Sequence, residues 1–522
     1  MTQSPPSSVL VVGGGVVGLA CAHYLGRAGL TVTVLERDRL GSGASRGNAG
    51  EICPDRVEPL GAPGVAVKAL TGVFRPDSPL WINPVPSIPL LRFLAGLRLR
   101  STARHHGTGA AALAALAEDT FALFEELEAL GVDGGAGKDG FLFAYPSYED
   151  AAHGLAGFRR LGAPVAPEGV LRGAAQAGTE PALGPAARAG FLVERQWAVD
   201  PGQLMDTLAE RLRRDGAELV EGARVTAVRD GAGRVEVRTS AGTCQADAVV
   251  IAAGVWSRQV CASLGVRIDV ATGKGYSFSV PAESLPRRLV HLGSAKAVPA
   301  PLGKGVRVAG TMEFDRDPDR FRQGRVEALV AAARPYLPGA DWERREQEWM
   351  GPRPMTPDGL PLIGPLPGRP RVLLATGHNM LGRDAGPGDG TAGRRAADGG
   401  GGPGPAARFA PGRSVGPAPS GSALGAQAEQ RHLQGERRLL GEGGRLLPAA
   451  RVGGRDGAQA LYALGRPLRV RRGEGQGHAP PVGQRGFELA RVVRLHGNSL
   501  PSRPMKIALR HGGRMSRRDG SH

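Results

Sequence analysis

A glycine-rich turn between two apolar runs lies close to the N-terminus of the chain. Val9–Val12 is a short apolar run that suits a buried parallel strand, and the turn Gly13-x-Gly15-x-x-Gly18 follows at once. A helical pattern comes next, and a second β-branched run then ends in Glu36. Strand, turn, helix, strand and terminal acid are the parts of a dinucleotide-binding unit, so the motif stands in the structural context that it requires.

Each part of this unit has a physical task. Gly13 allows the tight turn, Gly15 lets a pyrophosphate approach the backbone, and Gly18 lets the helix pack closely on the strand. The helix opens at Val16 and Val17, where its first N–H groups have no partner within the helix and can bind phosphate. These five residues are therefore expected to bind the cofactor.

The second strand ends in Glu36, followed by Arg37. A carboxylate at this place can accept hydrogen bonds from both ribose hydroxyls of an adenosine. It favours a ribose without a 2′-phosphate, and therefore FAD or NAD over NADP. Both residues are expected at the cofactor site.

A net charge of +17 raises the question of a nucleic-acid partner. Residues 383–522 hold 24 Lys and Arg against 10 Asp and Glu, whereas residues 1–382 hold 42 against 39. The body of the chain is thus nearly neutral. The basic tail lacks the regular aromatic residues of a base-stacking surface, so no nucleic-acid partner is expected.

Three features that the sequence lacks indicate where in the cell the protein is located. The chain has no run of 18 or more apolar residues, and its first eight residues, MTQSPPSS, contain no basic residue, which argues against a spanning helix and a secretory signal. The four cysteines show no CxxC spacing, so we expect thiols in a reducing compartment and no metal site. These features predict a cytoplasmic protein. The segment Phe93–Arg100 could at most contact a membrane surface peripherally, but a core-packing helix is favoured.

Two patterns alternate farther along the chain. Residues 110–130 carry an apolar stripe at helical spacing, and residues 201–257 repeat the α/β theme with a helix, strands and a hairpin. Residues 270–350 instead show short β-like runs before a helix near residues 324–333. This second pattern predicts a separate, mainly antiparallel domain.

Taken together, these pieces resemble the FAD-dependent amine oxidoreductases that include D-amino acid dehydrogenase, glycine oxidase and sarcosine oxidase. The chain is most similar to the D-amino acid dehydrogenase branch. The matching motifs keep the family's order over residues 8–382, so their combination is far more specific than any one of them. They are the Gly13–Glu36 unit, Ser45-x-x-Asn48-Ala49-Gly50, Asp200-Pro201, Ala252-Ala-Gly-x-Trp-Ser257, Lys274-Gly-Tyr276, Gly351-Pro-Arg-Pro-Met-Thr-Pro-Asp-Gly359 and Thr376-Gly-His-Asn-Met-Leu-Gly382.

The resemblance implies an α/β fold of two parts and a tail. A Rossmann-like FAD-binding domain with a mainly parallel sheet would comprise residues 8–76, 190–268 and 350–382. An α+β substrate domain with an antiparallel sheet would comprise residues 77–189 and 269–349. Residues 383–522 would form a disordered basic tail rich in Gly, Arg and Pro.

The resemblance also implies positions for further cofactor-binding residues. Ser45, Asn48, Ala49 and Gly50 would lie along the flavin, and Ala253 and Gly254 near the pyrophosphate. Four more residues complete the expected cofactor site: Val225, Trp256, Gly377 and Gly382.

Three residues are candidates for substrate contact. Arg353 is expected to grip the substrate carboxylate, because a guanidinium matches a carboxylate with two parallel hydrogen bonds. Tyr276 is expected to cap the pocket and donate to the same carboxylate, although a tyrosine on a strand is more often a core residue. By similarity His378 would lie at the flavin edge, where a structural role is an equal alternative.

The function implied is FAD-dependent oxidative deamination of a D-amino acid to a 2-oxo acid and ammonia, by hydride transfer from Cα to flavin N5. Electrons would pass to a quinone or another acceptor in dehydrogenase-like members, and to O₂ in oxidases. An oxidase or dehydrogenase of glycine, sarcosine or a cyclic imino acid such as hydroxyproline is the alternative. The sequence carries no signal for an oligomeric state.

The family pattern breaks after Gly382. The family continues with Val-Thr-Leu-Ala-Pro-Ala-Thr-Gly and a final helix, but this chain reads Arg383-Asp-Ala-Gly-Pro-Gly-Asp-Gly-Thr391. The codons CGT GAC GCT GGC CCC GGC GAC GGG AC encode the observed residues. Read one base later, as GTG ACG CTG GCC CCG GCG ACG GGA, they encode the family's segment residue for residue. The sequence therefore predicts a one-base frameshift after Gly382.

This frameshift has a chemical consequence. In the family, the helix after Gly382 directs its N-terminus at the flavin and steadies the negative charge of its reduced form. Without it we expect weak FAD retention and low turnover, so an inactive flavoprotein remnant is a further alternative. Residues 408–413 do resemble the family's closing phrase, which leaves a brief return of the frame open, and a genuine basic disordered tail is the other interpretation.

Overall fold

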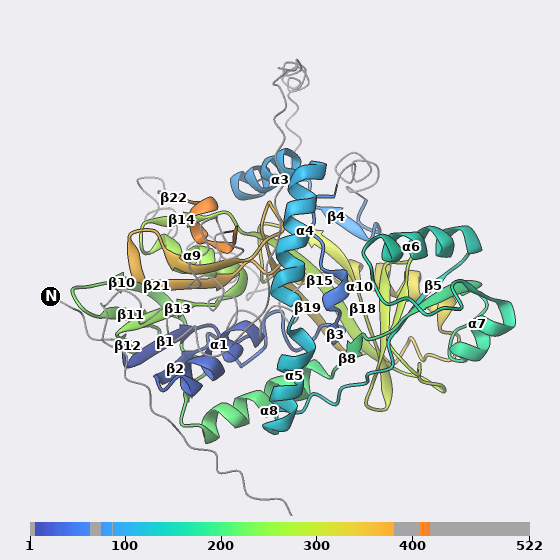
Figure 1. Cartoon of the computed structure of the whole chain (residues 1–522), viewed down its shortest axis with the longest axis horizontal. Coiled ribbons are helices and arrows are strands. Elements are labelled where there is room, and N and C mark those ends of the chain that lie inside the picture. The colour runs from blue at the N-terminus through green and yellow to red at the C-terminus, as the bar shows by residue number, and fades with distance from the viewer. Residues whose placement is uncertain (1–5, 63–74, 86, 381–407, 418–522) are drawn as a thin grey trace, which may run out of the picture.

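The computed structural model of the chain describes residues 6–62, 75–85, 87–380 and 408–417. A mainly parallel sheet and a larger, mainly antiparallel sheet lie side by side, and helices run along the junction between them (Figure 1). The predicted α/β fold with one parallel and one antiparallel part is therefore confirmed.

The parallel sheet has six strands in the order β20-β21-β13-β1-β2-β9, of which only the edge strand β20 is antiparallel to its neighbour. Because β1 lies between β2 and β13, the connections leave it toward opposite sides of the sheet. Such a switch point opens a crevice at the carboxyl ends of the strands, where α/β sheets bind ligands. The bounds are β1 Ser8–Val12, β2 Thr31–Leu35, β9 Glu218–Val220, β13 Ala248–Ile251, β20 Leu362–Leu366 and β21 Arg369–Thr376.

Different layers cover the two faces of this sheet. Helices α1 (Val16–Arg27) and α8 (Pro201–Arg214) pack on one face, where Leu19 and Leu208 belong to the same apolar core. The other face is covered by helix α9 and by a three-stranded antiparallel sheet. Their bounds are β10 Val225–Asp230, β11 Val235–Thr239, β12 Gly242–Ala246 and α9 Ser257–Ala262.

The second sheet has nine strands, in the order β19-β15-β18-β17-β16-β5-β7-β6 with β4 paired to β18. All its pairs are antiparallel except β16 with β5 and β18 with β4. Helix α10 (Gln323–Ala333) buries Val326 and Leu329 in the core of this sheet, and α6 (Tyr148–Arg160) and α7 (Gly173–Thr179) lie at its other end. The strand bounds are β4 Leu80–Ile82, β5 Phe141–Tyr145, β6 Leu171–Arg172, β7 Ala189–Val193, β15 Ala271–Pro281, β16 Val290–Leu292, β17 Ala297–Leu302, β18 Gly305–Phe314 and β19 Glu346–Met355.

The single helix predicted for residues 110–130 is two helices, preceded by a third. They are α3 Ile88–Arg100, α4 Ala103–Ala117 and α5 Thr120–Ala129. The break lies where the hydroxyl of Thr120 donates to the carbonyl of Ala117. The break also lets the apolar stripe serve two cores, because Leu113 packs in one apolar cluster and Leu127 in another.

Ten residues of the segment expected to be tail are part of the folded body. The side chain of Phe409 is 2% exposed in a cluster with Leu113, and Arg413 donates to Asp358 at 2.8 Å and to the carbonyl of Leu360 at 2.6 Å. Strand β22 (Val415–Pro417) pairs with β14 (Val266–Ile268). Residues 408–413 thus make the contacts of a closing segment of this fold. Residues 381–407 and 418–522, where the frameshift and the rest of the tail fall, lie outside the described residues.

The remaining short elements connect these layers. They are β3 Glu51–Ile52, which pairs with β8 Trp197–Ala198, and the 3₁₀ turns η1 Pro54–Arg56, η2 Gly254–Trp256, η3 Arg334–Tyr336 and η4 Pro411–Arg413. None of the helices in the described ranges is long and apolar enough to cross a bilayer.

Candidate active site

A single cavity of about 1540 Å³ runs from the carboxyl ends of β1 and β2 to the face of the antiparallel sheet. It is larger than the 300–1,000 Å³ typical of a small-molecule site, so it has room for a dinucleotide together with a substrate. One end is lined by the turn after β1, and the other is lined by residues of the antiparallel sheet such as Arg353.

At the first end, the turn between β1 and α1 is packed tightly against β13. Gly13 has a φ of +109°, and a Cβ atom there would lie 2.6 Å from the carbonyl oxygen of Ala252. A side chain at Gly18 would collide with the carbonyl oxygen of Gly13, so this glycine sets the close helix–strand contact predicted for it. Gly15 is the N-cap of α1 and has no side chain to cap the helix. The turn is therefore a cradle of backbone N–H groups open to an anion.

The carboxylate of Glu36 is held in place next to this cradle. Its Oε2 accepts a 2.7 Å hydrogen bond from the N–H of Gly14, and its Oε1 accepts one of 2.9 Å from the N–H of Asp38. A carboxylate has about four acceptor positions, so two remain for a ribose. The guanidinium of the neighbouring Arg37 lies 4.1 Å from the ring centre of Trp256, and both line the cavity.

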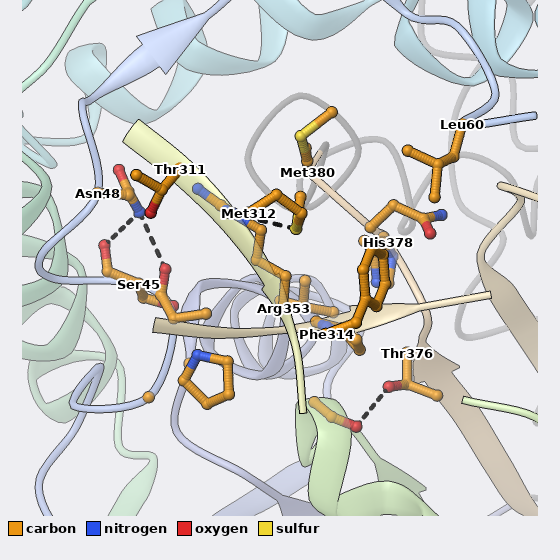
Figure 2. Close-up of a pocket in the computed structure, with 18 of the residues that line it drawn as sticks. Ser45, Asn48, Leu60, Thr311, Met312, Phe314, Arg353, Thr376, His378 and Met380 are labelled. Atoms are coloured by element: carbon orange, nitrogen blue, oxygen red, sulfur yellow. Dashed lines mark hydrogen bonds between the residues drawn. The ribbon is translucent and has the colours of Figure 1, made fainter. Parts of the chain in front are cut away.

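A loop of small residues, 41–50, forms the next part of the wall and is fixed by hydrogen bonds. The hydroxyl of Ser45 accepts from the N–H of Val16 at 3.0 Å, and the amide of Asn48 donates to the carbonyls of Ala44 and Ser45 (Figure 2). From behind, the hydroxyl of Ser277 donates to the carbonyl of Gly47 at 2.5 Å. This loop is thus a rigid surface of backbone, suited to contact with a flat ring.

At the second end, Arg353 projects into the cavity from β19, between Pro352 and Pro354. Its guanidinium lies against the backbone of Gly275, where a side chain would collide with it, and Nη1 lies 3.9 Å from Sδ of Met312. Figure 2 shows Arg353 and Met312 meeting in the middle of the cavity. Around them Figure 2 labels three apolar side chains, Leu60, Phe314 and Met380, together with Thr311 and His378. A planar cation in such surroundings is well suited to bind a carboxylate.

His378 follows β21 and is held by a tight turn. Its side chain is 3% exposed and lines the cavity. The next residue, Asn379, has a φ of +54° and joins two segments: its Oδ1 accepts from the N–H of Thr356 at 3.0 Å, and its Nδ2 donates to the carbonyl of Gly377 at 2.9 Å. Asn379 belongs to the Thr376–Gly382 motif, and its hydrogen bonds give it a positioning role that the motif alone does not indicate.

Tyr276, expected to cap the pocket, is not among the residues that line the cavity. Its side chain is 1% exposed in the core of the antiparallel sheet, and its hydroxyl donates to Oε2 of Glu313 at 2.8 Å. Burial and the charge of Glu313 raise the pKa of Tyr276 far above its usual value. Tyr276 therefore lies behind the wall.

Lys274, which belongs to the same motif as Tyr276, explains why Tyr276 lies behind the cavity wall. Its ammonium, with a fully buried side chain, pairs with Glu313 at 2.6 Å and with Asp315 at 3.2 Å. Burial alone would raise the pKa of Asp315, but Lys274 and Arg322 hold it below its usual range. The Lys274-Gly-Tyr276 motif thus supplies a buried ionic cluster, and its glycine makes space for Arg353.

The structure brings most of the expected site residues together on the cavity wall. Gly18, Gly50 and Gly377 pack behind it, and Gly382 lies outside the described residues. The expected residues that line it are Gly13, Gly15, Val16, Val17, Glu36, Arg37, Ser45, Asn48, Ala49, Val225, Ala253, Gly254, Trp256, Arg353 and His378.

Sequence reasoning missed one wall of the cavity. His291 and Glu51 face each other there with 3.4 Å between Nε2 and Oε2, and the ring of Phe143 is stacked on His291 at 4.4 Å. Tyr145 lines the same wall. Its ring lies against Gly293, in space that a side chain at residue 293 would occupy. Phe143, Tyr145 and His291 come from short strands without a recognisable motif, and Glu51 belongs to the stretch Asn48-Ala-Gly-Glu-Ile-Cys-Pro, which is typical of the dehydrogenase-like members but does not indicate this contact.

The chain is similar to one protein family, to curated D-amino acid dehydrogenases and to a glycine oxidase of known structure. The family model described as "FAD dependent oxidoreductase" (DAO) matches residues 8–398. D-amino acid dehydrogenase of Rhizorhabdus wittichii is 31% identical over 391 residues, covering 73% of this chain and 94% of the relative. D-amino acid dehydrogenase of Cereibacter sphaeroides is 33% identical over 388 residues, covering 72% and 88%. Among solved structures, glycine oxidase from Geobacillus kaustophilus superposes with a TM-score of 0.58 at 25% identity, covering 79% of this chain and all of that one.

Proposed function

Because the chain belongs to the DAO family of FAD dependent oxidoreductases, we propose that it oxidises a D-amino acid to a 2-oxo acid and ammonia. FAD is the cofactor of the family. The observation that carries the choice of substrate class is Arg353, a guanidinium set on a rigid strand in the apolar end of the cavity. It offers a two-pronged site for an α-carboxylate.

The residues at the first end of the cavity fit FAD. The Gly13–Gly18 turn would hold the pyrophosphate on backbone N–H groups, because any side chain at Gly13 would fill the approach. The two unused acceptor positions of Glu36 would bind the ribose hydroxyls, and the loop 41–50 would support the ring. Bound FAD supplies the two-electron sink for oxidation of a carbon–nitrogen bond.

The residues at the second end bind and orient the substrate. Arg353 would fix the carboxylate and so direct the Cα–H bond toward the first end of the cavity. Met312 and Phe314 exclude water from the reacting carbon, which strengthens the contact between guanidinium and carboxylate. His378, held by the Asn379 turn, is proposed to contact the substrate amine from the other side.

An oxidase or dehydrogenase of glycine, sarcosine or a cyclic imino acid is the second candidate, supported by the structural likeness to a glycine oxidase at 25% identity. The acceptor distinguishes the two classes, and we propose a quinone or other carrier. Release of hydrogen peroxide on addition of the amine under air would instead indicate an oxidase.

The departure from the family pattern after Gly382 is proposed to weaken FAD retention and turnover. The chain as written and a version with the reading frame corrected from residue 383 should be expressed side by side. Lower flavin content and activity for the chain as written would support this proposal, and equal values would overturn it.

The proposed reaction is tested with the frame-corrected protein and an artificial electron-accepting dye. D-amino acids should reduce the dye and yield one molecule of 2-oxo acid for every two electrons that the dye accepts, and L-enantiomers should not. Dye reduction by glycine, sarcosine or hydroxyproline alone would favour the second candidate, and reduction by none of these amines would overturn both.

We propose a cytoplasmic location with peripheral contact to the inner face of the plasma membrane.

A further inference from the structure

Helix α3 is apolar on two opposite faces. Its inner face is buried, with Leu90 and Phe93 only 6% and 2% exposed in a cluster that also holds Phe314. On its outer face Ile88 is 67% exposed and Leu99 is 74% exposed. An apolar helix face is normally covered by other parts of a protein, so the outer face calls for a partner.

The exposed apolar residues form one stripe. Ile88, Leu91 and Leu99 are spaced by three and eight residues, which places them on the same side of an α-helix. Leu91 is 54% exposed, as is Val85 just before the helix. Of the eight large hydrophobic side chains that are exposed in the described part of the chain, four thus lie between residues 85 and 99.

The charged residues of the segment that carries this stripe have one sign. Residues 78–117 contain four arginines and neither Asp nor Glu. Three of these arginines, Arg92, Arg98 and Arg104, are exposed on α3 and at the start of α4. Helices α3 and α4 meet at the outer edge of the molecule (Figure 1). Apolar side chains flanked by arginines on an exposed helix are the pattern of a helix that lies in the interface of a lipid bilayer.

The stripe also borders the cavity. Leu90, Leu91, Leu94 and Leu97 line the cavity from α3, and Leu91 is at once exposed and part of the wall. The apolar end of the cavity therefore reaches the surface beside the stripe.

We propose that α3 docks the protein on an anionic bilayer surface, with Ile88, Leu91 and Leu99 inserted among the lipid headgroups and the arginines paired with lipid phosphates. Docking in this orientation turns the apolar mouth of the cavity toward the lipid. If the proposed oxidation holds, an apolar electron acceptor dissolved in the bilayer then enters the cavity past Leu91. The docking itself does not depend on that function.

Charge complementarity favours lipid over two other occupants. A second copy of the chain in a two-fold dimer would set the same arginines against each other. The chain's own residues 418–522 carry 19 Lys and Arg against 7 Asp and Glu, so they match the sign of the stripe. An anionic lipid surface complements both the apolar side chains and the arginines.

The test is co-sedimentation of the full chain with vesicles of phosphatidylcholine alone and with vesicles that also contain phosphatidylglycerol. Ile88→Ser/Leu99→Ser removes the apolar part of the stripe, and Arg92→Glu/Arg104→Glu reverses the charge. Arg160→Glu/Leu161→Ser at the C-terminal end of α6 is the matched control, because both residues are exposed and neither lines the cavity. Thermal melting by circular dichroism confirms that each variant is folded.

Binding to the anionic vesicles should fall at least about tenfold in each stripe variant and stay unchanged in the control. Activity with a soluble dye should remain normal in all three, so that a failure of docking is distinguishable from a failure of the proposed function. Absence of binding, or equal binding by all variants, overturns the proposal. So does binding that is lost only when residues 418–522 are removed, or a dimer in solution that the Ile88→Ser/Leu99→Ser variant dissociates.

Discussion

The guanidinium of Arg353 on β19 lies directly against the backbone of Gly275 on β15, in space that any side chain at residue 275 would occupy. The two strands are antiparallel neighbours in the sheet that forms one wall of the cavity. The missing Cβ atom of Gly275 is therefore what allows the guanidinium to lie where it faces the cavity. The proposed substrate-binding end of the site depends on this pair.

Substituting Gly275→Ala should displace the guanidinium by about 1 Å, because the added methyl group overlaps it. A misplacement of about 1 Å can cost on the order of a hundredfold in rate, so we expect kcat/KM to fall about 10- to 100-fold, mainly through KM. FAD content should stay the same. Steady-state kinetics checks this against Gly324→Ala in α10, where no atom lies near the added methyl group. Wild-type kinetics in Gly275→Ala would contradict the role of the pair.

The Arg353→Lys variant keeps the positive charge but loses the planar fork. Because a bidentate hydrogen bond to a carboxylate contributes about 1.5–3 kcal/mol, kcat/KM should fall at least about tenfold. An exposed arginine, Arg344, gives the matched control Arg344→Lys. If the lysine variant kept the wild-type KM for an amino acid, the carboxylate would be bound elsewhere.

Glu36→Gln should weaken FAD binding. The carboxylate accepts N–H groups at both oxygens, from Gly14 and Asp38, and glutamine would place an amino group against one of these donors. We expect the FAD dissociation constant to rise at least about tenfold, measured by fluorescence titration of the apoprotein. Glu210→Gln on the exposed face of α8 is the control, and equal affinities in the two variants would refute the ribose-binding role.

His23 should make the fold sensitive to acid. Its side chain is 2% exposed in α1, both ring nitrogens lack hydrogen-bond partners among the described residues, and burial followed by the charge of Arg27 lowers its pKa to about 4. Between pH 6.5 and about 4 the unfolded chain binds a proton that the folded chain does not. The contribution of a neutral His23 to stability is thus complete above pH 6.5 and is lost as the pH falls toward 4.

His23→Leu should remove this part of the pH dependence and leave the stability at neutral pH equal or higher, because a buried polar group without partners is replaced by an apolar one. Urea unfolding of both proteins from neutral pH to pH 4 is the measurement. If the free energies of unfolding of the two proteins changed with pH in parallel, His23 would not take up a proton when the chain unfolds.

Phe409→Ala should destabilise the protein by about 3 kcal/mol, the usual cost of removing a buried phenylalanine side chain. The comparison is Phe321→Ala, since Phe321 is 41% exposed whereas Phe409 is 2% exposed. Urea unfolding of both variants would show whether residues 408–417 are a working part of the fold. Equal unfolding midpoints would mean that the segment contributes nothing.

The first end of the site could be predicted from the sequence because its signal is local. The Gly13–Gly18 turn and Glu36 lie within one short stretch, and each has a task that backbone geometry imposes. Arg353 could be identified because it belongs to a recognisable motif with two flanking prolines. Its support by Gly275 could not, since that contact depends on the register of β15 against β19.

Other features depend on contacts between residues far apart in the chain. Tyr276 matches a motif but faces Glu313 on the neighbouring strand, and strand alternation alone did not say which face would line the cavity. The stacked pair of Phe143 and His291 forms only when β5 and β16 meet in the sheet. The break at Thr120 likewise reflects two separate cores rather than the helical period of the sequence.

The central claim is that this chain holds FAD in the cavity and that a D-amino acid bound at Arg353 reduces it. The most direct measurement is the visible absorption of the frame-corrected, FAD-loaded protein under anaerobic conditions, as D- and L-amino acids are added in turn. The yellow absorption band should bleach with one or more D-amino acids, and Arg353→Lys should require far higher concentrations of the same compounds. A protein that takes up no FAD, or whose absorption band is unchanged by every amine, would contradict the account.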